Sequence, residues 1–260
     1  MYQLLPPSRR NRQVDLAEVY AYPGGARRWV RANMVASVDG AATADGKSEG
    51  ISGEADKRIF GVLRALADVV LVGAGTVRAE HYRPAKVRDQ YQAARAAAGQ
   101  APTAAIAVVS GLLDLDWSLP LFAEPAVQTI VLTSEAAPPE QVEAATAAGV
   151  EVIAAGAGYV DLGLAVDRLA ERGLGRILCE GGPHLLAQLA AAERLDELCL
   201  SVSPQLRGGD SMRILAGPDL TGGLPLILHT LLTEDGFLFS RYLVGTLSTA
   251  KKGESDGGEG

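Results

Sequence analysis

Short β-branched runs alternate with alanine-rich helical patterns along most of the chain, and no other feature of the sequence restricts the fold as strongly. A strand followed by a helix and then by another strand needs a crossover connection, so this order predicts a largely parallel sheet. Most of the strand-like runs are typical of strands buried on both faces. The predicted strands are residues 29–37, 68–73, 103–110, 128–133, 150–155 and 176–180. The predicted helices are residues 54–67, 138–149, 161–173 and 183–195, with a surface helix over 87–100.

The end of the chain has a different pattern. Residues 225–245 contain two strand-like runs around Asp235-Gly236, a dipeptide that favours a tight hairpin turn. We therefore expect an α/β fold whose mostly parallel central sheet is flanked by helices and is completed by a C-terminal antiparallel hairpin. The length of 260 residues suits one domain of this class. We place it at residues 29–246, between an N-terminal extension (1–28) and a disordered, glycine-rich tail (247–260).

Composition argues against several classes of function. The net charge of −7 comes without a basic stripe, which argues against nucleic acid as a partner. The longest apolar runs are too short to span a membrane and the N-terminus lacks a signal-peptide pattern, so we expect a cytoplasmic protein. Cys179 and Cys199 have no CxxC spacing and the three histidines are scattered, which predicts neither a disulfide nor a metal site.

A glycine turn follows the second predicted strand. The segment DVVLVGAGTVRAE runs from that strand through Gly73-Ala74-Gly75-Thr76 into a helix. Glycines let a pyrophosphate approach the backbone, and the free N–H groups of a helix start attract an anion. A plain strand-to-helix turn explains the same residues equally well. The motif is not a GxGxxG fingerprint, because Arg78 stands in place of the last glycine.

A second glycine turn occurs later in the chain. The segment RILCEGGPHLLAQLA ends a strand at Glu180, passes Gly181-Gly182 and starts a helix at Pro183, a favoured first helical residue. If the two preceding strands are neighbours, the two turns form a crevice that can hold the two halves of a dinucleotide. Glu180 either accepts a hydrogen bond from a ring N–H of a substrate or caps the glycine turn.

Four segments in a fixed order carry a family resemblance: NMVASVDG, LRALADVVLVGAGTVRAE, LCEGGPHLLAQL and SPQLRGG. With them the chain, over residues 29–244, resembles the riboflavin-biosynthesis pyrimidine reductases, the C-terminal half of a bifunctional deaminase-reductase. The resemblance implies a dihydrofolate reductase-like fold, NADPH as cofactor and a homodimer. It also implies reduction of 5-amino-6-(5-phosphoribosylamino)uracil by hydride transfer to the ribosyl C1′. The zinc signature of the deaminase half is absent from the sequence.

The resemblance also implies roles for single residues. Ser37, Asp39 and Gly40 match a Ser-x-Asp-Gly loop, so residues 37–53 are expected to cover the nicotinamide and the substrate and to exclude water; an ordinary Asp-Gly turn is the alternative. The candidate catalytic residues, as proton relays, are Asp39 and Glu180. The implied substrate contacts are Asn33, Ser37, Ser48, Arg64, Arg83 and Glu180. The implied cofactor contacts are Val35, Gly73, Gly75, Thr76, Val77, Glu80, Ser110, Gly181, Gly182, Pro183, His184, Leu185 and Leu186.

Several residues depart from the family pattern. Ala41 stands where the family often has lysine, and the segment around Gly50 lacks its frequent tryptophan. Residues 80–88 (EHYRPAKVR) replace the usual Asp-Asp-Pro-x-Leu-Thr-x-Arg, so Arg83 or Arg88 supplies the charge for a substrate phosphate. Arg64 is a further candidate for that phosphate, or an exposed helix charge.

Three functions stay open on the sequence alone. Besides the pyrimidine reductase, the residues suit reduction of a dihydrofolate or dihydropterin, with Glu180 against the ring, or a sensor that binds NADPH without turnover. The sequence does not choose between NADPH and NADH either. No arginine adjoins Ser110, where the resemblance places the adenosine end, to indicate a pocket for the 2′-phosphate.

Overall fold

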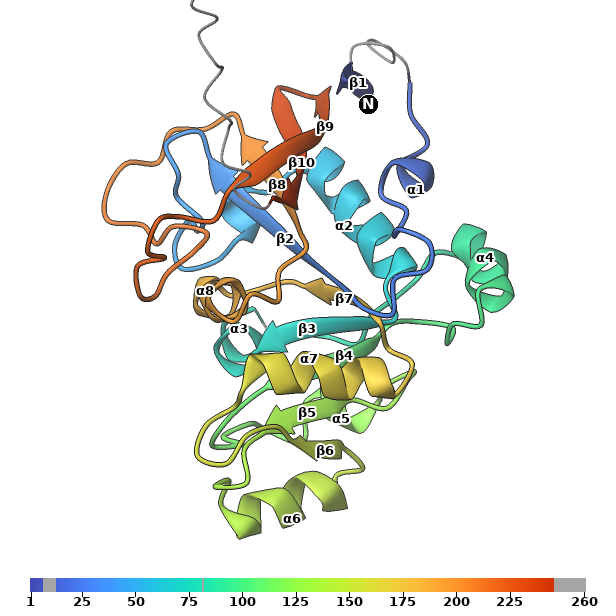
Figure 1. Ribbon diagram of the computed structural model, residues 1–260, viewed down its shortest axis with the longest axis vertical. Coiled ribbons are helices and arrows are strands. Elements are labelled where there is room, and N and C mark those ends of the chain that lie inside the picture. The colour runs from blue at the N-terminus through green and yellow to red at the C-terminus, as the bar shows by residue number, and fades with distance from the viewer. Residues whose placement is uncertain (7–12, 81, 246–260) are drawn as a thin grey trace, which may run out of the picture.

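The computed structural model describes residues 1–6, 13–80 and 82–245, which form one mixed sheet with helices on both faces (Figure 1). The strand order is β1-β9-β10-β8-β2-β7-β3-β4-β5-β6. The strands are β1 (Tyr2–Leu5), β2 (Trp29–Ser37), β3 (Val69–Gly73), β4 (Ala105–Val109), β5 (Ile130–Thr133), β6 (Glu151–Ala154), β7 (Arg176–Cys179), β8 (Glu197–Ser203), β9 (Leu226–Glu234) and β10 (Phe237–Val244). The helices are α1 (Leu16–Val19), α2 (Glu54–Leu66), α3 (Ala74–Ala79), α4 (Gln92–Ala97), α5 (Pro120–Ala123), α6 (Pro139–Ala147), α7 (Leu162–Glu171) and α8 (Pro183–Ala191), with 3₁₀ turns η2 (Glu49–Ile51) and η3 (Asp89–Tyr91).

The strands predicted from the alternating pattern pair in parallel, in the order β2-β7-β3-β4-β5-β6. Along β3, Val69 and Leu71 belong to the core on one face of the sheet, and Val70 and Val72 to the core on the other. All four are fully buried, which explains an apolar run without alternation. The predicted fold class is confirmed: the sheet is mostly parallel and ends in C-terminal antiparallel strands.

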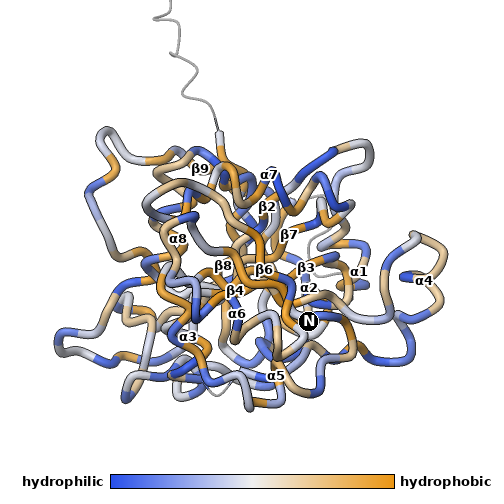
Figure 2. Tube along the Cα trace, turned by 90° about the horizontal axis from the view of Figure 1, so that it is seen from below, coloured by the Kyte–Doolittle hydropathy of each residue, from blue (hydrophilic) through white to orange (hydrophobic). Residues whose placement is uncertain are grey.

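Helices cover both faces of this sheet. On one face α2, α5 and α6 pack through Ile59, Phe122 and Ala145, and on the other α7 and α8 pack through Val166 and Leu189. Of these helices, α2, α6, α7 and α8 occupy the predicted ranges, with differences only at their ends. The sequence pattern does not predict α5, and the predicted helix over 87–100 is reduced to η3 and α4. Figure 2 shows the apolar strands at the centre and the polar segments mainly around them.

The sequence pattern does not predict β8, which pairs in parallel with β2 and antiparallel with β10. Its first residue, Glu197, is fully buried and accepts hydrogen bonds from Arg31 on β2 (2.8 Å) and Arg241 on β10 (2.6 Å). Burial alone raises the pKa of Glu197, but the two arginines outweigh it and the pKa is lowered. The Glu197 carboxylate makes β8 look unlike a buried strand in the sequence. In the structure the same carboxylate links the parallel part of the sheet to the antiparallel part.

The antiparallel part contains the predicted hairpin of β9 and β10. Its turn has positive φ at Asp235 (51°) and Gly236 (80°), the signature of a type I′ turn. The first residues of the chain also reach this part, since β1 pairs with residues 231–233 of β9. The predicted tail, residues 247–260, lies outside the described residues. Among the helices that are described, none is both long and apolar enough to cross a membrane.

Candidate active site

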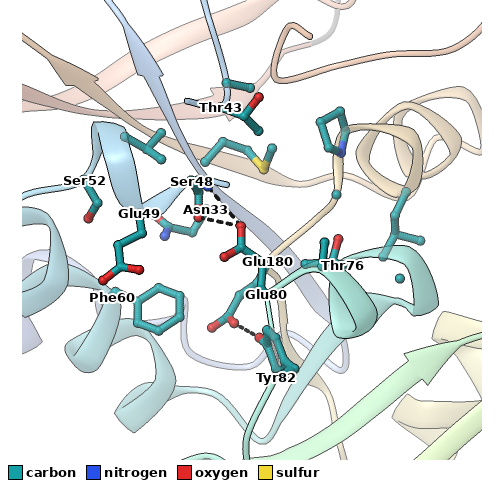
Figure 3. Close-up of a pocket in the computed structure, with 18 of the residues that line it drawn as sticks. Asn33, Thr43, Ser48, Glu49, Ser52, Phe60, Thr76, Glu80, Tyr82 and Glu180 are labelled. Carbon is teal, nitrogen blue, oxygen red and sulfur yellow. Dashed lines mark hydrogen bonds between the residues drawn. The ribbon is translucent and has the colours of Figure 1, made fainter. Parts of the chain in front are cut away.

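A cavity of about 900 Å³ opens at the carboxyl ends of β2, β3 and β7. Its walls come from these strand ends, from α2, from the starts of α3 and α8, and from the loop that contains η2 (Figure 3). Open α/β sheets bind their ligands at the carboxyl ends of parallel strands. The volume lies in the range of small-molecule sites.

The two glycine turns meet at this edge of the sheet. β3 and β7 are adjacent strands, and the backbone N–H of Gly73 donates a hydrogen bond to the carbonyl oxygen of Gly181 (2.9 Å). A Cβ on Gly182 would lie 2.9 Å from Oγ1 of Thr76, closer than real Cβ atoms come, so any other residue here would displace the Thr76 side chain or the helix start. The arrangement that the two motifs predict is therefore present, with α3 and α8 beginning next to each other.

The turns leave open backbone toward the cavity. An ideal Cβ on Gly75 would meet no described atom of another segment within 4 Å, and Gly75 lines the cavity with Thr76, Pro183 and His184. The first N–H groups of a helix have no acceptor within the helix and attract anions. These residues fit the pyrophosphate of a dinucleotide, because no side chain blocks its approach.

Glu180 and Arg64, both predicted to contact the substrate, bind each other. Nε and Nη2 of Arg64 donate to the two carboxylate oxygens of Glu180 at 2.8 and 2.6 Å. The side chain of Glu180 is only 4% exposed and that of Arg64 only 14% exposed. Such a bidentate pair, shielded from water, is strong and fixes both groups in place. Arg64 is therefore not an exposed helix charge, and the Glu180 carboxylate is engaged rather than free.

Tyr82, which the sequence analysis missed, completes this ion pair. Its hydroxyl donates to Glu180 (Figure 3) and accepts a hydrogen bond from Nη2 of Arg64 (2.7 Å). The guanidinium lies over the rings of Phe60 and Tyr82, 4.2 and 5.1 Å from their centroids, in cation–π contacts. Nη1 of Arg64 has no hydrogen-bond partner among the described residues and stays available to a ligand.

Asn33 and Ser48 also line the cavity. Oδ1 of Asn33 is buried and has no hydrogen-bond partner within the described part of the chain. Because an unpaired buried acceptor is costly, this atom marks a place where a ligand's N–H or O–H fits. Ser48 donates to Glu80 through its backbone N–H (3.0 Å) and its hydroxyl (3.1 Å), which ties the η2 loop to the end of α3 (Figure 3).

Known proteins share this sequence pattern. A sequence model described as the RibD C-terminal domain matches residues 28–233. The chain belongs to the RibD C-terminal domain family. A 2,5-diamino-6-ribosylamino-4(3H)-pyrimidinone 5′-phosphate reductase of Methanothermobacter thermautotrophicus is 35% identical over 190 residues, covering 73% of this chain and 83% of that protein. A reductase of the same name from Archaeoglobus fulgidus is 30% identical over 193 residues, covering 74% and 87%.

Solved structures share the fold of this chain. A pyrimidine reductase-like protein of Corynebacterium diphtheriae matches with a TM-score of 0.80 and 27% identity, covering 90% of this chain and 100% of that one. RibD of Acinetobacter baumannii matches with a TM-score of 0.67 and 18% identity, covering 85% of this chain and 59% of that one. The predicted family and the predicted reductase class are confirmed.

The Ser-x-Asp-Gly motif lies beside the cavity and not in its wall. The hydroxyl of buried Ser37 donates to Asp39, and Asp39 accepts the backbone N–H groups of Arg207 (3.0 Å) and Gly208 (2.7 Å). These hydrogen bonds, the one from Ser37 first, lower the pKa of Asp39 to about 2. The carboxylate predicted as a proton relay thus connects two motifs, and its oxygens are occupied.

The other predicted contacts fall into two groups. The first group does not line the cavity. Of its members, Val77 and Leu186 are buried in the core, and the hydroxyl of Ser110 accepts a hydrogen bond from the backbone N–H of Leu113 (3.1 Å). Gly181 is the fourth member. The remaining ones line the cavity: Asn33, Val35, Ser48, Arg64, Gly73, Gly75, Thr76, Glu80, Arg83, Glu180, Gly182, Pro183, His184 and Leu185.

The cavity wall also contains residues that no motif marks, among them Asp56 and Phe60. Asp56, Phe60 and Arg64 follow one another at four-residue spacing on α2, so they share one face of the helix. This four-residue spacing from Arg64 is the feature of the sequence from which Phe60 could have been predicted to line the site. Asp56 accepts hydrogen bonds from the hydroxyls of Ser52 (2.5 Å) and Ser201 (2.6 Å). No group of three or more metal-binding side chains occurs within the described ranges.

Proposed function

We propose that this chain is the NADPH-dependent reductase of a phosphorylated ribosylaminopyrimidine in riboflavin biosynthesis. The observation that carries the proposal is one cavity that joins the two glycine turns to the Arg64–Glu180 pair. The turns offer backbone amides to a dinucleotide, while the fixed guanidinium and the unpaired oxygen of Asn33 suit a polar, anionic substrate. The reductase names of the relatives support the same activity.

On the cofactor side, we place the dinucleotide across the glycine turns, with the nicotinamide next to Val35 in the cavity wall. When bound, NADPH supplies the hydride that reduces the ribosyl C1′. The chain itself supplies orientation, because the amides at Gly75 and His184 hold the pyrophosphate. The η2 loop, held by the bonds between Ser48 and Glu80, limits the access of water.

On the substrate side, Oδ1 of Asn33 accepts an N–H of the pyrimidine and Nη1 of Arg64 donates to an oxygen of the sugar or the phosphate. Arg83 is the phosphate ligand that we prefer over Arg88. It lines the cavity, whereas Arg88 does not, and it forms no ion pair with any described residue. Glu180 fixes Arg64 through two hydrogen bonds, which assigns it a positioning role.

Reduction of dihydrofolate fits this geometry less well. A carboxylate that recognises an aminopyrimidine-like ring must present its oxygens to two ring N–H groups. Both oxygens of Glu180 are already used by Arg64, and one of them also by Tyr82. A sensor without catalysis differs from the reductase only in turnover, so kinetics separate the two.

The relatives and the sequence motifs suggest two forms of the pyrimidine. The relatives are named for the 2,5-diamino-4(3H)-pyrimidinone, and the sequence resemblance implies the 5-aminouracil, which differs at the ring carbon C2. The test is steady-state oxidation of NADPH by the purified protein with each ribosylamino 5′-phosphate and with dihydrofolate. We expect turnover with at least one pyrimidine and a large preference over the folate. Binding of NADPH without turnover of either pyrimidine would overturn the proposal.

We also propose a homodimer that works in the cytoplasm. Residues 226–229 of β9 are exposed and lie beyond the segment that pairs with β1, so half of this strand has a free edge within the described structure. Leu226, Ile227 and Leu228 are apolar, and an open apolar strand edge favours pairing with a second copy. The free thiols of Cys179 and Cys199 support a reducing compartment.

A further inference from the structure

We propose that Arg78 binds the 2′-phosphate of the cofactor and makes this reductase prefer NADPH over NADH. The inference rests on the proposed function, because it concerns the same dinucleotide. Arg78 belongs to α3, the helix that begins at the first glycine turn. It does not line the cavity, so it is free of the substrate contacts described above.

The path of a dinucleotide along the sheet leads toward this residue. At β2 the cavity is lined by Asn33 and Val35, and the glycine turns lie at the carboxyl ends of the next strands, β7 and β3. The sheet continues with β4 and β5, at about 4.8 Å per strand. A cofactor with its nicotinamide in the cavity and its pyrophosphate on the turns therefore extends its adenosine over the ends of β4 and β5.

Arg78 is fixed at this place. Its Nη1 donates to the main-chain carbonyl oxygen of Asp114, in the loop that follows β4, at 2.8 Å. The side chain is exposed and forms no ion pair with the described residues, and its Nε and Nη2 have no partner there. A bond to a neutral carbonyl orients the guanidinium and leaves its charge and two of its nitrogens for a phosphate.

The two loops that follow β4 and β5 contain no cation. Residues 110–119 after β4 and 134–138 after β5 include no lysine, arginine or histidine. Serines, Ser110 and Ser134, stand directly after these strands, and the acids of the two loops (Asp114, Asp116 and Glu135) come later, so no carboxylate stands at the strand end itself, where one typically holds the ribose hydroxyls of NADH. The acidic side chain nearest in sequence to the contact, Asp114, meets Arg78 through its main chain. Arginine without such a carboxylate is the pattern of a 2′-phosphate site.

The test is titration of the purified full chain with NADPH and with NADH, in which the fluorescence of the bound dihydronicotinamide reports binding. We expect the wild type to bind NADPH at least about tenfold more tightly than NADH, because hydrogen bonds between charged groups are among the strongest. Arg78→Gln should lose most of this preference, with NADH affinity changed by less than about twofold. Arg78→Lys should lie between them. Arg168→Gln, which removes an exposed arginine paired with Glu171 on α7, should change neither affinity.

Competition gives a second readout that does not depend on hydride transfer. The inhibition constant of adenosine 2′,5′-bisphosphate against NADPH should be higher for Arg78→Gln than for the wild type, and the inhibition constant of 5′-AMP should be the same for both. Equal losses for NADPH and NADH, or no loss for either, would overturn the inference, as would a wild type without preference. A wild type that binds neither nucleotide would overturn the proposed function itself. Circular dichroism melting shows whether Arg78→Gln is folded. If Arg78→Gln is not folded, the NADPH and NADH affinities of Arg78→Lys are compared with those of the wild type instead.

Discussion

Glu180 illustrates how single residues of the site depend on their partners. Glu180→Gln removes the anion that balances Arg64, so a buried cation loses its partner. We expect the free energy of unfolding to fall by about 3 kcal/mol and kcat/KM for the pyrimidine to fall with it. Urea denaturation and steady-state kinetics measure the two effects. Glu151→Gln is the control, because it breaks the half-exposed pair with Arg172 and should cost less than about 1 kcal/mol. Equal losses in the two variants would contradict the assignment.

Asp39 provides a prediction on pH. Its pKa is lowered from an ordinary 3.8 to about 2, so folding favours the ionised carboxylate. The stabilisation is therefore present above about pH 4 and is lost as the pH falls toward 2. We expect the amide hydrogens of Arg207 and Gly208 to exchange more slowly in the wild type than in Asp39→Asn, with the difference disappearing below about pH 2. Hydrogen exchange followed by NMR tests this. Asp210→Asn, an exposed acid in the same segment, should leave both amides unchanged.

At the scale of secondary-structure elements, the contact between the starts of α3 and α8 defines the crevice. Gly182→Ala would place its Cβ 2.9 Å from Oγ1 of Thr76, so the Thr76 side chain must rotate or the two helix starts must move apart. We expect a loss of about 1–3 kcal/mol of stability together with weaker binding of NADPH. Thermal denaturation and fluorescence titration measure both.

Gly75→Ala is the matched variant in the other turn. Its Cβ has free space and its position is helical, so the fold should gain up to about 1 kcal/mol. Binding of NADPH should still weaken, because the methyl group stands where the pyrophosphate approaches. If Gly182→Ala were as stable as Gly75→Ala, the two helix starts would not be in the close contact described above.

The elements also show where pattern reading succeeds. The parallel strands are short, apolar on both faces and separated by helices, so local composition is sufficient to find them. β8 escapes because it begins with Glu197, whose charge is balanced by arginines on two other strands. β1 escapes because its partner, residues 231–233, lies at the opposite end of the sequence.

At the scale of the whole molecule, the free half of β9 predicts the assembly. Ile227 is 60% exposed on this edge. Ile227→Glu places a charge on the proposed interface, so we expect the protein to become monomeric without a loss of secondary structure. Light scattering coupled to size exclusion gives the mass. Leu112→Glu, at a residue 72% exposed in the loop after β4, should leave the mass unchanged. A dimer that persists in Ile227→Glu would exclude this edge as the interface.

The sequence by itself determined the α/β class, the two glycine turns, the hairpin and the family, because each depends on the order of local residue types along the chain. Only the tertiary structure decided what the charged groups bind. Arg64 meets Glu180, Asp39 meets the backbone of Arg207 and Gly208, and Arg78 reaches the loop after β4. These partners are far apart in the sequence, and charges attract through space, so no local pattern encodes their pairing.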